Sequence, residues 1–128
     1  MMNFFGIGTD IVSIDRIKKS LKNKNFFKRI FNEKEILKCK KTIKSINCFA
    51  KRFAAKEAFS KALGTGIANG INFNEIIVLN KKSGRPYIIL VGQTKKTLSK
   101  KFKGKKSKVS LSLSDEKKYA VAFVTISL

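Results

Sequence analysis

The chain has 128 residues, of which 29 are Lys or Arg, 8 are Asp or Glu and none is His, so its formal net charge is +21. A chain of this length can bury a core as one domain without disulfides or metal, and its charge predicts attraction to polyanions without saying which. The lack of histidine excludes Ser-His-Asp triads and histidine metal sites, so any chemistry must use carboxylates, lysines or a bound metal.

The first predicted element is a mostly buried strand over residues 4–12. Alternation along a strand places Gly6, Gly8 and Asp10 on one face, and glycines inside a strand suggest that backbone or ligand approaches closely there. An ionised carboxylate within an apolar strand is costly unless it is paired or bound to a metal. Asp10 is therefore a candidate functional residue.

A helix is predicted to begin near Ile14, with Ser13 as its cap. Its apolar face, formed by Ile14, Ile17 and Leu21, would point toward the core. The opposite face is a basic row, whose members are Arg16, Lys18, Lys19 and Lys22. Such a row is either an ordinary solvated face or a docking surface for a partner.

Two further helices are predicted over residues 26–31 and roughly 33–45. Asn32, followed three residues later by Glu35, is a suitable cap for the second of them. The first is rich in phenylalanine, and its spacing fits burial in a core better than a base-stacking platform; the aromatic residues are Phe26, Phe27 and Phe31.

Cys39 and Cys48 lie in lysine-rich helical sequence and fit no metal-ligand spacing. The sequence has neither a signal peptide nor a long apolar run. We therefore expect reduced thiols in a soluble, cytoplasmic protein that makes no contact with a membrane.

The strongest helix prediction covers residues 49–63, which contain five alanines and neither glycine nor proline. Gly64 fits as the residue just past the end of this helix. At about 100° per residue one broad side faces the core, and it is formed by Phe49, Phe53, Phe59 and Leu63. Glu57 and Lys61 project together from another side, either as an ordinary surface ion pair or as the polar wall of a recess floored by alanine methyl groups.

Asp10 and Glu57 stand out among the acidic residues. Most of the others, Glu35 included, have polar or turn-like surroundings in the sequence. Two carboxylates in apolar segments favour a functional site over a surface ion pair, because a buried charge needs a partner or a metal.

The rest of the chain predicts a closing series of short elements. A loop containing Gly64, Gly66 and Gly70 comes first. In chain order the others are a strand at about 73–79, a turn at 82–86, a strand at 87–91, a surface helix at 93–102, a solvated basic loop at 103–108 and a hairpin of 109–114 with 119–126. With no internal repeat or linker, residues 1–128 are expected to form a single domain.

Three stretches share their order and spacing with a known family. They are Gly6-x-Gly8-x-Asp10-Ile11-Val12-x-Ile14-x-Arg16, Arg52-Phe53-Ala54-Ala55-Lys56-Glu57-Ala58-Phe59-Ser60-Lys61-Ala62-Leu63-Gly64-Thr65-Gly66-Ile67, and Ser83-Gly84-Arg85-Pro86 with Val109-Ser110-Leu111-Ser112. Over nearly the whole chain they resemble bacterial holo-[acyl-carrier-protein] synthase. The resemblance implies a compact α+β domain, with a mostly antiparallel sheet packed on a long central helix, and assembly as a homotrimer whose active sites are shared between neighbours.

The resemblance also implies an activity and residue roles. The activity is Mg²⁺-dependent transfer of 4'-phosphopantetheine from coenzyme A to a serine of acyl carrier protein, in fatty acid biosynthesis. Asp10 and Glu57 would hold the metal, Glu57 and Lys61 would be catalytic, and either Glu57 or a water on the metal would accept the serine proton. The implied substrate-binding residues are Arg52, Lys61, Gly64, Arg85 and Pro86, and the implied carrier-protein contacts are Arg16, Lys18, Lys19 and Lys22.

Two residues of these motifs need separate comment. Lys56 is expected to be structural or substrate-binding, either by snorkelling outward or by reaching a neighbouring subunit. Leu113 follows Ser112 where the family commonly has Ser-x-Ser-His, which puts in doubt any contribution of that side chain to turnover or subunit contacts; it simply continues the inward row of its strand.

Two other functions remain open. A small basic nucleic-acid-binding protein is supported by the charge alone, although the sequence has no zinc spacing, RNA-binding aromatic motif or helix-turn-helix pattern. A relative of the same fold that modifies a different carrier domain is the second, and the short length of the chain favours the stand-alone type instead.

Overall fold

The computed structural model describes residues 3–64 and 70–128. Its strands in these ranges are β1 (Phe4–Ser13), β2 (Ile76–Asn80), β3 (Pro86–Leu90), β4 (Lys108–Asp115) and β5 (Tyr119–Ser127). The helices there are α1 (Ile14–Ser20), α2 (Lys24–Ile30), α3 (Glu33–Lys40), α4 (Ser45–Leu63) and α5 (Gly92–Lys101), with a short 3-10 turn η1 (Phe73–Glu75) before β2. None of these helices is long and apolar enough to cross a bilayer. The predicted α+β class, long central helix and closing hairpin are confirmed.

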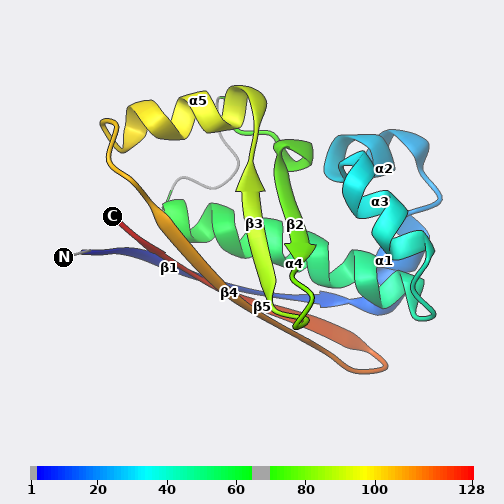
Figure 1. Ribbon diagram of the computed structural model, residues 1–128. Coiled ribbons are helices and arrows are strands. Elements are labelled where there is room, and N and C mark those ends of the chain that lie inside the picture. Colours follow the sequence, from blue (N-terminus) through cyan, green and yellow to red (C-terminus); the bar gives the residue numbers. More distant parts are fainter. Residues whose placement is uncertain (1–2, 65–69) are drawn as a thin grey trace.

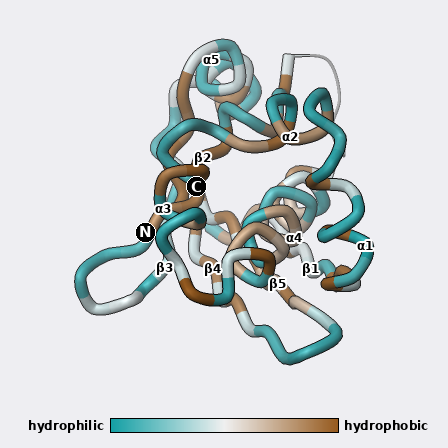
Figure 2. Tube along the Cα trace, turned by 90° about the vertical axis from the view of Figure 1, so that its right-hand side faces the viewer, coloured by the Kyte–Doolittle hydropathy of each residue, from teal (hydrophilic) through white to brown (hydrophobic). Residues whose placement is uncertain are grey.

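Helix α4 lies between two antiparallel sheets (Figure 1). Strand β5 pairs with β1 and β4 to form what we call the main sheet, in the order β1-β5-β4, and β2 pairs separately with β3. The main sheet runs beneath α4 in Figure 1, the β2–β3 hairpin crosses α4 in this view, α5 lies above it, and α1, α2 and α3 gather at its N-terminal end. Figure 2 shows hydrophilic segments on the outer turns that surround α4. Because α4 is covered on several sides, even Arg52 and Lys56 are buried in it.

The glycines of β1 allow α4 to pack directly against the main sheet. A methyl group added at Gly6 would collide with the carbonyl oxygen of Ala62, and one added at Gly8 would collide with that of Ala58. The predicted close approach of backbone to this face of the strand is therefore confirmed. Asp10 is the next residue on the same face of β1, so this close packing also fixes the position of Asp10 relative to α4.

Apolar side chains surround α4 in two clusters. The cluster around its C-terminal half includes Phe59 and Leu63 and joins it to β2, α5 and β5. The cluster around its N-terminal half joins it to α1, α2 and α3, where the rings of Phe27 and Phe31 meet that of Phe49 edge-on with centroids 5.4 and 4.9 Å apart. Of the phenylalanines predicted for the core, Phe31, just after α2, is the most buried, with an exposure of 3%.

Side-chain caps set the beginnings of the short helices. The hydroxyl of Ser13 accepts a hydrogen bond from the backbone N–H of Arg16, as predicted. Asn32 and Glu35 form the predicted capping box at the start of α3. These caps satisfy N–H groups that have no partner within the helix.

The predicted helix over 33–45 is too long. Helix α3 ends at Lys40, and α4 already begins at Ser45 rather than near residue 49. The backbone N–H of Thr42 turns back to the carbonyl of Cys39 at 3.1 Å, which closes a tight turn between the two helices. The turn reverses the chain so that α4 can pack on the main sheet, and no glycine or proline marks it in the sequence.

A disulfide joins Cys39 of α3 to Cys48 of α4 across this turn, with their Cα atoms 5.4 Å apart. Both residues are buried, with exposures of 0% and 4%. The expectation of reduced thiols is therefore wrong for the state that the structure describes. The chain reversal between α3 and α4 brings the two sulfurs together, and sequence spacing alone did not reveal it.

A fully buried ion pair joins α3 to α4. Nζ of Lys56 donates to Oε1 of Glu35 at 2.6 Å and to the carbonyl oxygens of Ile30 and Phe73, each at 2.7 Å. Glu35 also accepts two backbone N–H groups, at 3.0 and 2.9 Å. Both side chains are 0% exposed, so Lys56 is structural and does not snorkel outward. The expectation that Glu35 has polar surroundings is also wrong, because the capping box faces the core.

The face of the main sheet that points away from α4 is apolar and exposed. Its large apolar residues are Ile7, Ile11, Tyr119, Val121 and Phe123, with exposures of 52%, 63%, 46%, 37% and 44%. The strand register places Ile11 beside Val121 and Thr9 beside Phe123, so these side chains form one continuous surface. Contiguous exposed apolar surface of this kind marks an interaction site.

Candidate functional site

Asp10 and Lys61 meet where β1 crosses α4. Nζ of Lys61 lies 3.1 Å from Oδ1 of Asp10 and donates to the carbonyl of Thr9 at 3.0 Å. Glu57 lies one turn before Lys61 on the helix, and it lines the same cavity as Asp10. The structure thus brings together the three residues that the sequence singled out.

The charge of Glu57 is the least compensated of the three. Partial burial, and then the negative charge of Asp10, raise the pKa of Glu57, while Lys61 acts in the opposite direction. Lys61 makes its ion pair with Asp10, so Glu57 faces a like charge. A cation placed between the two carboxylates would lower this pKa.

The two carboxylates suit a hard divalent cation. Mg²⁺ prefers oxygen ligands and is commonly held by one or two carboxylates together with waters and substrate phosphates. Within residues 3–64 and 70–128 no cluster of three or more His, Cys, Asp or Glu side chains could hold a metal. Asp10 and Glu57 would therefore need oxygens from a substrate or water to complete the coordination, which fits Mg²⁺ better than a structural zinc site.

Two cavities meet at Glu57. One, of about 330 Å³, is lined by polar groups that include Asp10 and Arg16. The other, of about 550 Å³, has apolar walls that include Phe53 and Phe73. This arrangement can accept a substrate with a charged centre and an apolar extension.

The apolar cavity was missed by sequence reasoning, which assigned Phe53 to the core. Phe53 is only partly buried, and its ring meets that of Phe73 with centroids 6.0 Å apart. Residues four apart on a helix are neighbours on its surface. The spacing of Phe53 and Glu57 was therefore a signal that the aromatic ring borders the carboxylate.

The predicted basic row on and just beyond α1 is exposed at every position, namely Arg16, Lys18, Lys19 and Lys22. Arg16 differs from the lysines because it also lines the cavity that contains Asp10 and Glu57. The basic row therefore borders the carboxylates directly.

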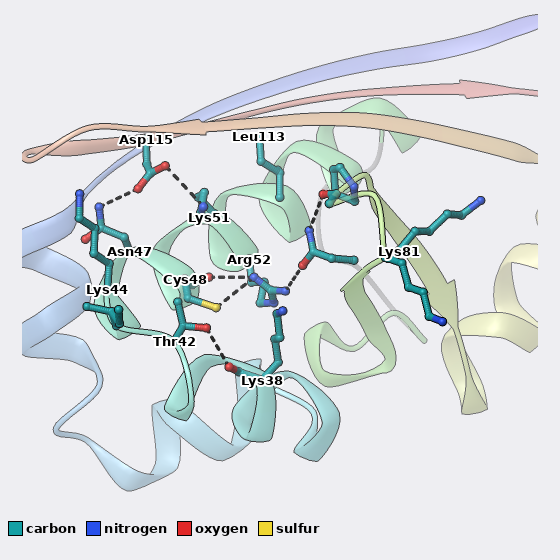
Figure 3. Close-up of a pocket in the computed structure, with 15 residues that line it drawn as sticks. Lys38, Thr42, Lys44, Asn47, Cys48, Lys51, Arg52, Lys81, Leu113 and Asp115 are labelled. Carbon is teal, nitrogen blue, oxygen red and sulfur yellow. Dashed lines mark hydrogen bonds and ion pairs between the residues drawn. The ribbon is translucent and has the colours of Figure 1, made fainter.

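Arg52 and Pro86 lie at a separate cavity of about 810 Å³ (Figure 3). At about 100° per residue, Arg52 and Lys61, nine positions apart, project in opposite directions from α4. The other cationic residues that line this cavity are Lys38, Lys44, Lys51, Lys81 and Lys82. The predicted substrate-binding residues thus divide between two sides of the central helix.

The guanidinium of Arg52 is held by several acceptors. Nε donates to the carbonyl of Val78 at 3.1 Å, Nη2 to Oδ1 of Asn80 at 2.7 Å, and Nη1 to Sγ of Cys48 at 3.2 Å. Asn80 in turn donates to the carbonyl of Gly84 at 3.0 Å. Burial lowers the pKa of Arg52, against the opposing effect of the Glu35 charge. Arg52 braces the turn between β2 and β3, and its direct contact with a phosphate stays a prediction.

The remaining predicted positions are placed as follows. Arg85 is exposed in the turn before Pro86, and Gly64 ends α4 in the left-handed conformation, where no atom of residues 3–64 or 70–128 outside its chain neighbours would lie within 4 Å of an added Cβ. The predicted loop glycine Gly66 lies outside the described residues. Leu113 packs against the core and lines the Arg52 cavity, and so continues the inward row of β4 as expected.

Known proteins of one family are similar to this chain. Residues 6–124 match the 4'-phosphopantetheinyl transferase superfamily. A holo-[acyl-carrier-protein] synthase of Pelagibacter ubique is 50% identical over 125 residues, which cover 98% of each chain. The crystal structure of holo-[acyl-carrier-protein] synthase from Neisseria meningitidis has a TM-score of 0.86 at 41% identity, covering 96% of this chain and 98% of that one. A Bacillus anthracis holo-(acyl-carrier-protein) synthase in complex with CoA (3',5'-ADP) has a TM-score of 0.79 at 37% identity, covering 99% and 98%. The chain therefore belongs to the holo-[acyl-carrier-protein] synthases of the 4'-phosphopantetheinyl transferase superfamily.

Proposed function

We propose that this chain transfers 4'-phosphopantetheine from coenzyme A to a serine of apo acyl carrier protein, with Mg²⁺ as cofactor, in fatty acid biosynthesis. The observation that carries the proposal is the meeting of Asp10 and Glu57 at one cavity, with Lys61 paired to Asp10, in a chain of this family. The products are holo acyl carrier protein and adenosine 3',5'-bisphosphate. The relatives named above support the same reaction, and the Bacillus anthracis relative was solved in complex with CoA (3',5'-ADP).

The serine oxygen attacks the β-phosphorus of coenzyme A, and the bond from that phosphorus to the bridging oxygen breaks as adenosine 3',5'-bisphosphate leaves. Mg²⁺ bound to Asp10 and Glu57 would supply Lewis-acid stabilisation of the diphosphate charge. Lys61, which pairs with Asp10 in the structure, would turn its ammonium toward the phosphate oxygens. Either Glu57 or a water on the metal would accept the serine proton.

The cavities on either side of Glu57 suggest how the two substrates approach. The apolar cavity with Phe53 and Phe73 suits the pantetheine arm, which consists largely of methylene, methyl and amide groups. The polar cavity opens beside Arg16, so the acceptor serine would arrive over α1. The two reacting groups would then meet at Glu57.

The basic row of α1 is our proposed carrier-protein contact. Its members are Arg16, Lys18, Lys19 and Lys22, all of them exposed. Acyl carrier proteins are acidic as a family, so the net charge of +21 would favour their approach. Such docking should weaken as salt screens the charges.

The adenosine end of coenzyme A would use the Arg52 cavity, with Arg85 and Pro86 beside the base. Arg52 and Lys61 project from opposite sides of α4, so a single coenzyme A bound across both groups requires two copies of the chain. The exposed apolar face of the main sheet supports such an assembly. We therefore propose a homotrimer in which Glu57 and Lys61 of one copy work with Arg52 of its neighbour, and Gly64 borders the bound substrate.

The proposal also covers the domain organisation, the location and the two alternative functions. Residues 1–128 would act as one catalytic domain, and the protein would work in the cytoplasm, where coenzyme A and carrier protein are available. A nucleic-acid-binding role rests only on the charge, and it leaves the Asp10 and Glu57 pair without a purpose. Modification of a different carrier domain would use the same site and differ only at the docking row.

The proposal is tested by incubating the protein with coenzyme A, Mg²⁺ and apo acyl carrier protein and measuring the intact mass of the carrier. Asp10→Ala and Glu57→Ala should each abolish the phosphopantetheine mass increase, and Lys61→Ala should slow it by about 100-fold or more, as loss of one charged transition-state contact does. Glu116→Ala, in the exposed turn between β4 and β5, is the matched control and should retain full activity. Full activity of either carboxylate variant with unchanged Mg²⁺ dependence would refute the metal assignment.

A further inference from the structure

We propose that Cys39 and Cys48 form a reversible thiol–disulfide pair that controls the shape of the Arg52 cavity and thereby the affinity for the phosphorylated adenosine end of coenzyme A. The identity of that ligand rests on the proposed function. The redox behaviour of the cysteine pair rests on the position of the disulfide and on the proposed cytoplasmic location.

The disulfide forms part of the cavity wall. Cys48 lines the cavity, and Figure 3 shows its sulfur directed at Arg52. Nη1 of Arg52 donates to Sγ of Cys48 at 3.2 Å and to the carbonyl oxygen of the same residue at 3.4 Å. The sulfur therefore touches the side chain that braces the opposite wall, the β2–β3 turn.

The disulfide also closes the loop between α3 and α4. This loop supplies Thr42, Ile43 and Lys44 to the cavity lining. Ile43 is fully exposed, so the loop has little apolar anchorage of its own. The other interactions that hold this loop are hydrogen bonds near the adjoining helix ends, such as that from Asn47 Nδ2 to Oδ2 of Asp115 at 2.7 Å. Breaking the disulfide would therefore loosen this wall while leaving the helices in place.

The surroundings favour reversible chemistry over a permanent cross-link. Disulfides of proteins in a reducing cytoplasm are usually transient and act in catalysis or redox sensing. Three cationic side chains of the cavity lining, Lys44, Lys51 and Arg52, lie close to Cys48 in sequence, and positive charge stabilises the thiolate that reacts. The cavity gives a small disulfide a route to this otherwise buried sulfur.

The co-reactant is a small-molecule disulfide of the glutathione class. The Cys48 thiolate attacks one sulfur of glutathione disulfide and releases one glutathione thiolate. Cys39, as its thiolate, then attacks the mixed disulfide at Cys48 and releases the second. Two protein thiols are oxidised and two glutathione thiols form, so electrons and protons balance; an excess of a dithiol reverses the exchange.

The oxidised form should bind the ligand more tightly. A wall held in its bound conformation avoids the entropy cost of ordering it on binding, which for one immobilised side chain corresponds to about threefold to tenfold in affinity. Reduction should raise the dissociation constant of the adenosine end by that factor. The turnover number should not change, because Glu57 and Lys61 lie on the other side of α4.

The test uses the full-length chain equilibrated with glutathione disulfide or with dithiothreitol. Alkylation and intact mass count the free thiols, which are unambiguous because the chain has only two cysteines. Calorimetry with adenosine 3',5'-bisphosphate as the probe then gives the dissociation constant of each form. We expect two thiols under reduction, none under oxidation, and a dissociation constant about threefold to tenfold higher for the reduced form.

Cys39→Ser provides the control, because it removes the cross-link and keeps the contact between Cys48 and Arg52. Under dithiothreitol its dissociation constant should equal that of the reduced wild type, and under glutathione disulfide Cys48 should stop at the mixed disulfide, which intact mass shows as one added glutathione. Two free thiols at every ratio of glutathione disulfide to glutathione, equal affinities of the two wild-type forms, or no binding of the probe in either form would each overturn the inference. A redox-dependent affinity without any phosphopantetheine transfer would support it and refute the proposed function. If Cys39→Ser fails to fold, the wild type alone tests the inference. Dithiothreitol should raise the dissociation constant of the oxidised form to that of the reduced form, and an unchanged dissociation constant would overturn the inference.

Discussion

Folding makes the ionised form of Glu57 less favourable, although the proposed reaction uses this carboxylate. Burial and the charge of Asp10 raise the pKa of this carboxyl above its ordinary value of 4.5, so the folded state binds a proton more tightly than the unfolded state does. The stability contributed by this group is therefore full below the unfolded pKa and is lost as pH rises through the folded pKa. At neutral pH the folded state carries a cost that Mg²⁺ between the two carboxylates would offset.

We predict that Glu57→Gln is more stable than the wild type at pH 7 without Mg²⁺, because the variant removes a partly buried charge and its repulsion from Asp10. The difference should shrink as the pH falls toward and below the ordinary carboxyl value of 4.5. Urea titrations that give the free energy of unfolding at several pH values measure this. Glu116→Gln, in an exposed turn, should show no such pH-dependent difference, and a Glu57→Gln variant less stable than wild type at pH 7 would contradict the assignment.

The individual site residues differ in how far sequence could predict them. Asp10 and Glu57 were predictable because a carboxylate in an apolar segment needs a partner. The division between Arg52 and Lys61 was also within reach, since helical spacing alone sends them in opposite directions. The burial of Glu35 was not predictable, because a capping-box sequence pattern is the same at the surface as in the core.

The packing of β1 on α4 decides whether the site exists at all. Gly8 lies against the carbonyl of Ala58, so Gly8→Ala would place a methyl group on backbone that cannot rotate away. We expect a loss of at least about 3 kcal/mol of folding stability, at the upper end of overpacking effects. Urea denaturation measures the loss, and the Asp10 and Glu57 cavity should open with it, which removes activity in the protein that remains folded.

Gly104→Ala is the matched control for this change. Gly104 has a φ of +75° but nothing within 4 Å of an added Cβ, so only the left-handed backbone is strained, which costs about 1–2 kcal/mol. A Gly8→Ala variant no less stable than Gly104→Ala would show that β1 and α4 can separate at little cost.

The buried pair of Lys56 and Glu35 ties α3, η1 and the end of α2 to the central helix. Burial, against the charge of Glu35, lowers the pKa of Lys56 to about 8, so its ammonium group is still mostly charged at neutral pH. Lys56→Met would leave the Glu35 carboxylate unpaired, and we predict a loss of about 3–5 kcal/mol of folding stability. Chemical denaturation at pH 7 gives this value directly.

Lys51→Met serves as its control, because Lys51 pairs with Asp115 at 3.4 Å with 31% and 24% of the two side chains exposed. A pair of this kind contributes about 1 kcal/mol or less. The double variant Lys56→Met with Glu35→Gln should recover part of the loss, since it also removes the unpaired charge. Equal losses for Lys51→Met and Lys56→Met would mean that the buried pair is not a structural anchor.

Elements with a strong local signal could be predicted from the sequence, and those set by tertiary contacts could not. The alanine-rich α4 and the alternating β4–β5 hairpin agree with their predictions. The end of α3 at Lys40 has no glycine or proline to mark it, and the turn there exists because α4 must reach the main sheet. The residues at this turn, the two cysteines included, were for that reason the least well predicted.

At the scale of the whole molecule the candidate groups do not converge within one copy. The carboxylates and Lys61 lie between α4 and the main sheet, whereas Arg52 and its cavity lie on the side of the β2–β3 turn. The sequence motifs identified both groups, but helical spacing gives only directions and cannot say what a second chain supplies. The apolar outer face of the main sheet is the feature that makes a shared site physically reasonable.

We therefore predict that Ile11→Asp prevents assembly and abolishes phosphopantetheine transfer while the chain remains folded. Ile11 is 63% exposed on the outer face of the main sheet, so an aspartate there is solvated in the single chain but buried without a partner in the assembly. Light scattering coupled to size exclusion gives the mass of the species, circular dichroism reports the fold, and the carrier mass assay reports activity. Leu37→Asp is the matched control, because Leu37 is 61% exposed on α3, away from the main sheet. It should leave both the assembly and the activity unchanged, and a fully active single chain of Ile11→Asp would show that one copy holds a complete site.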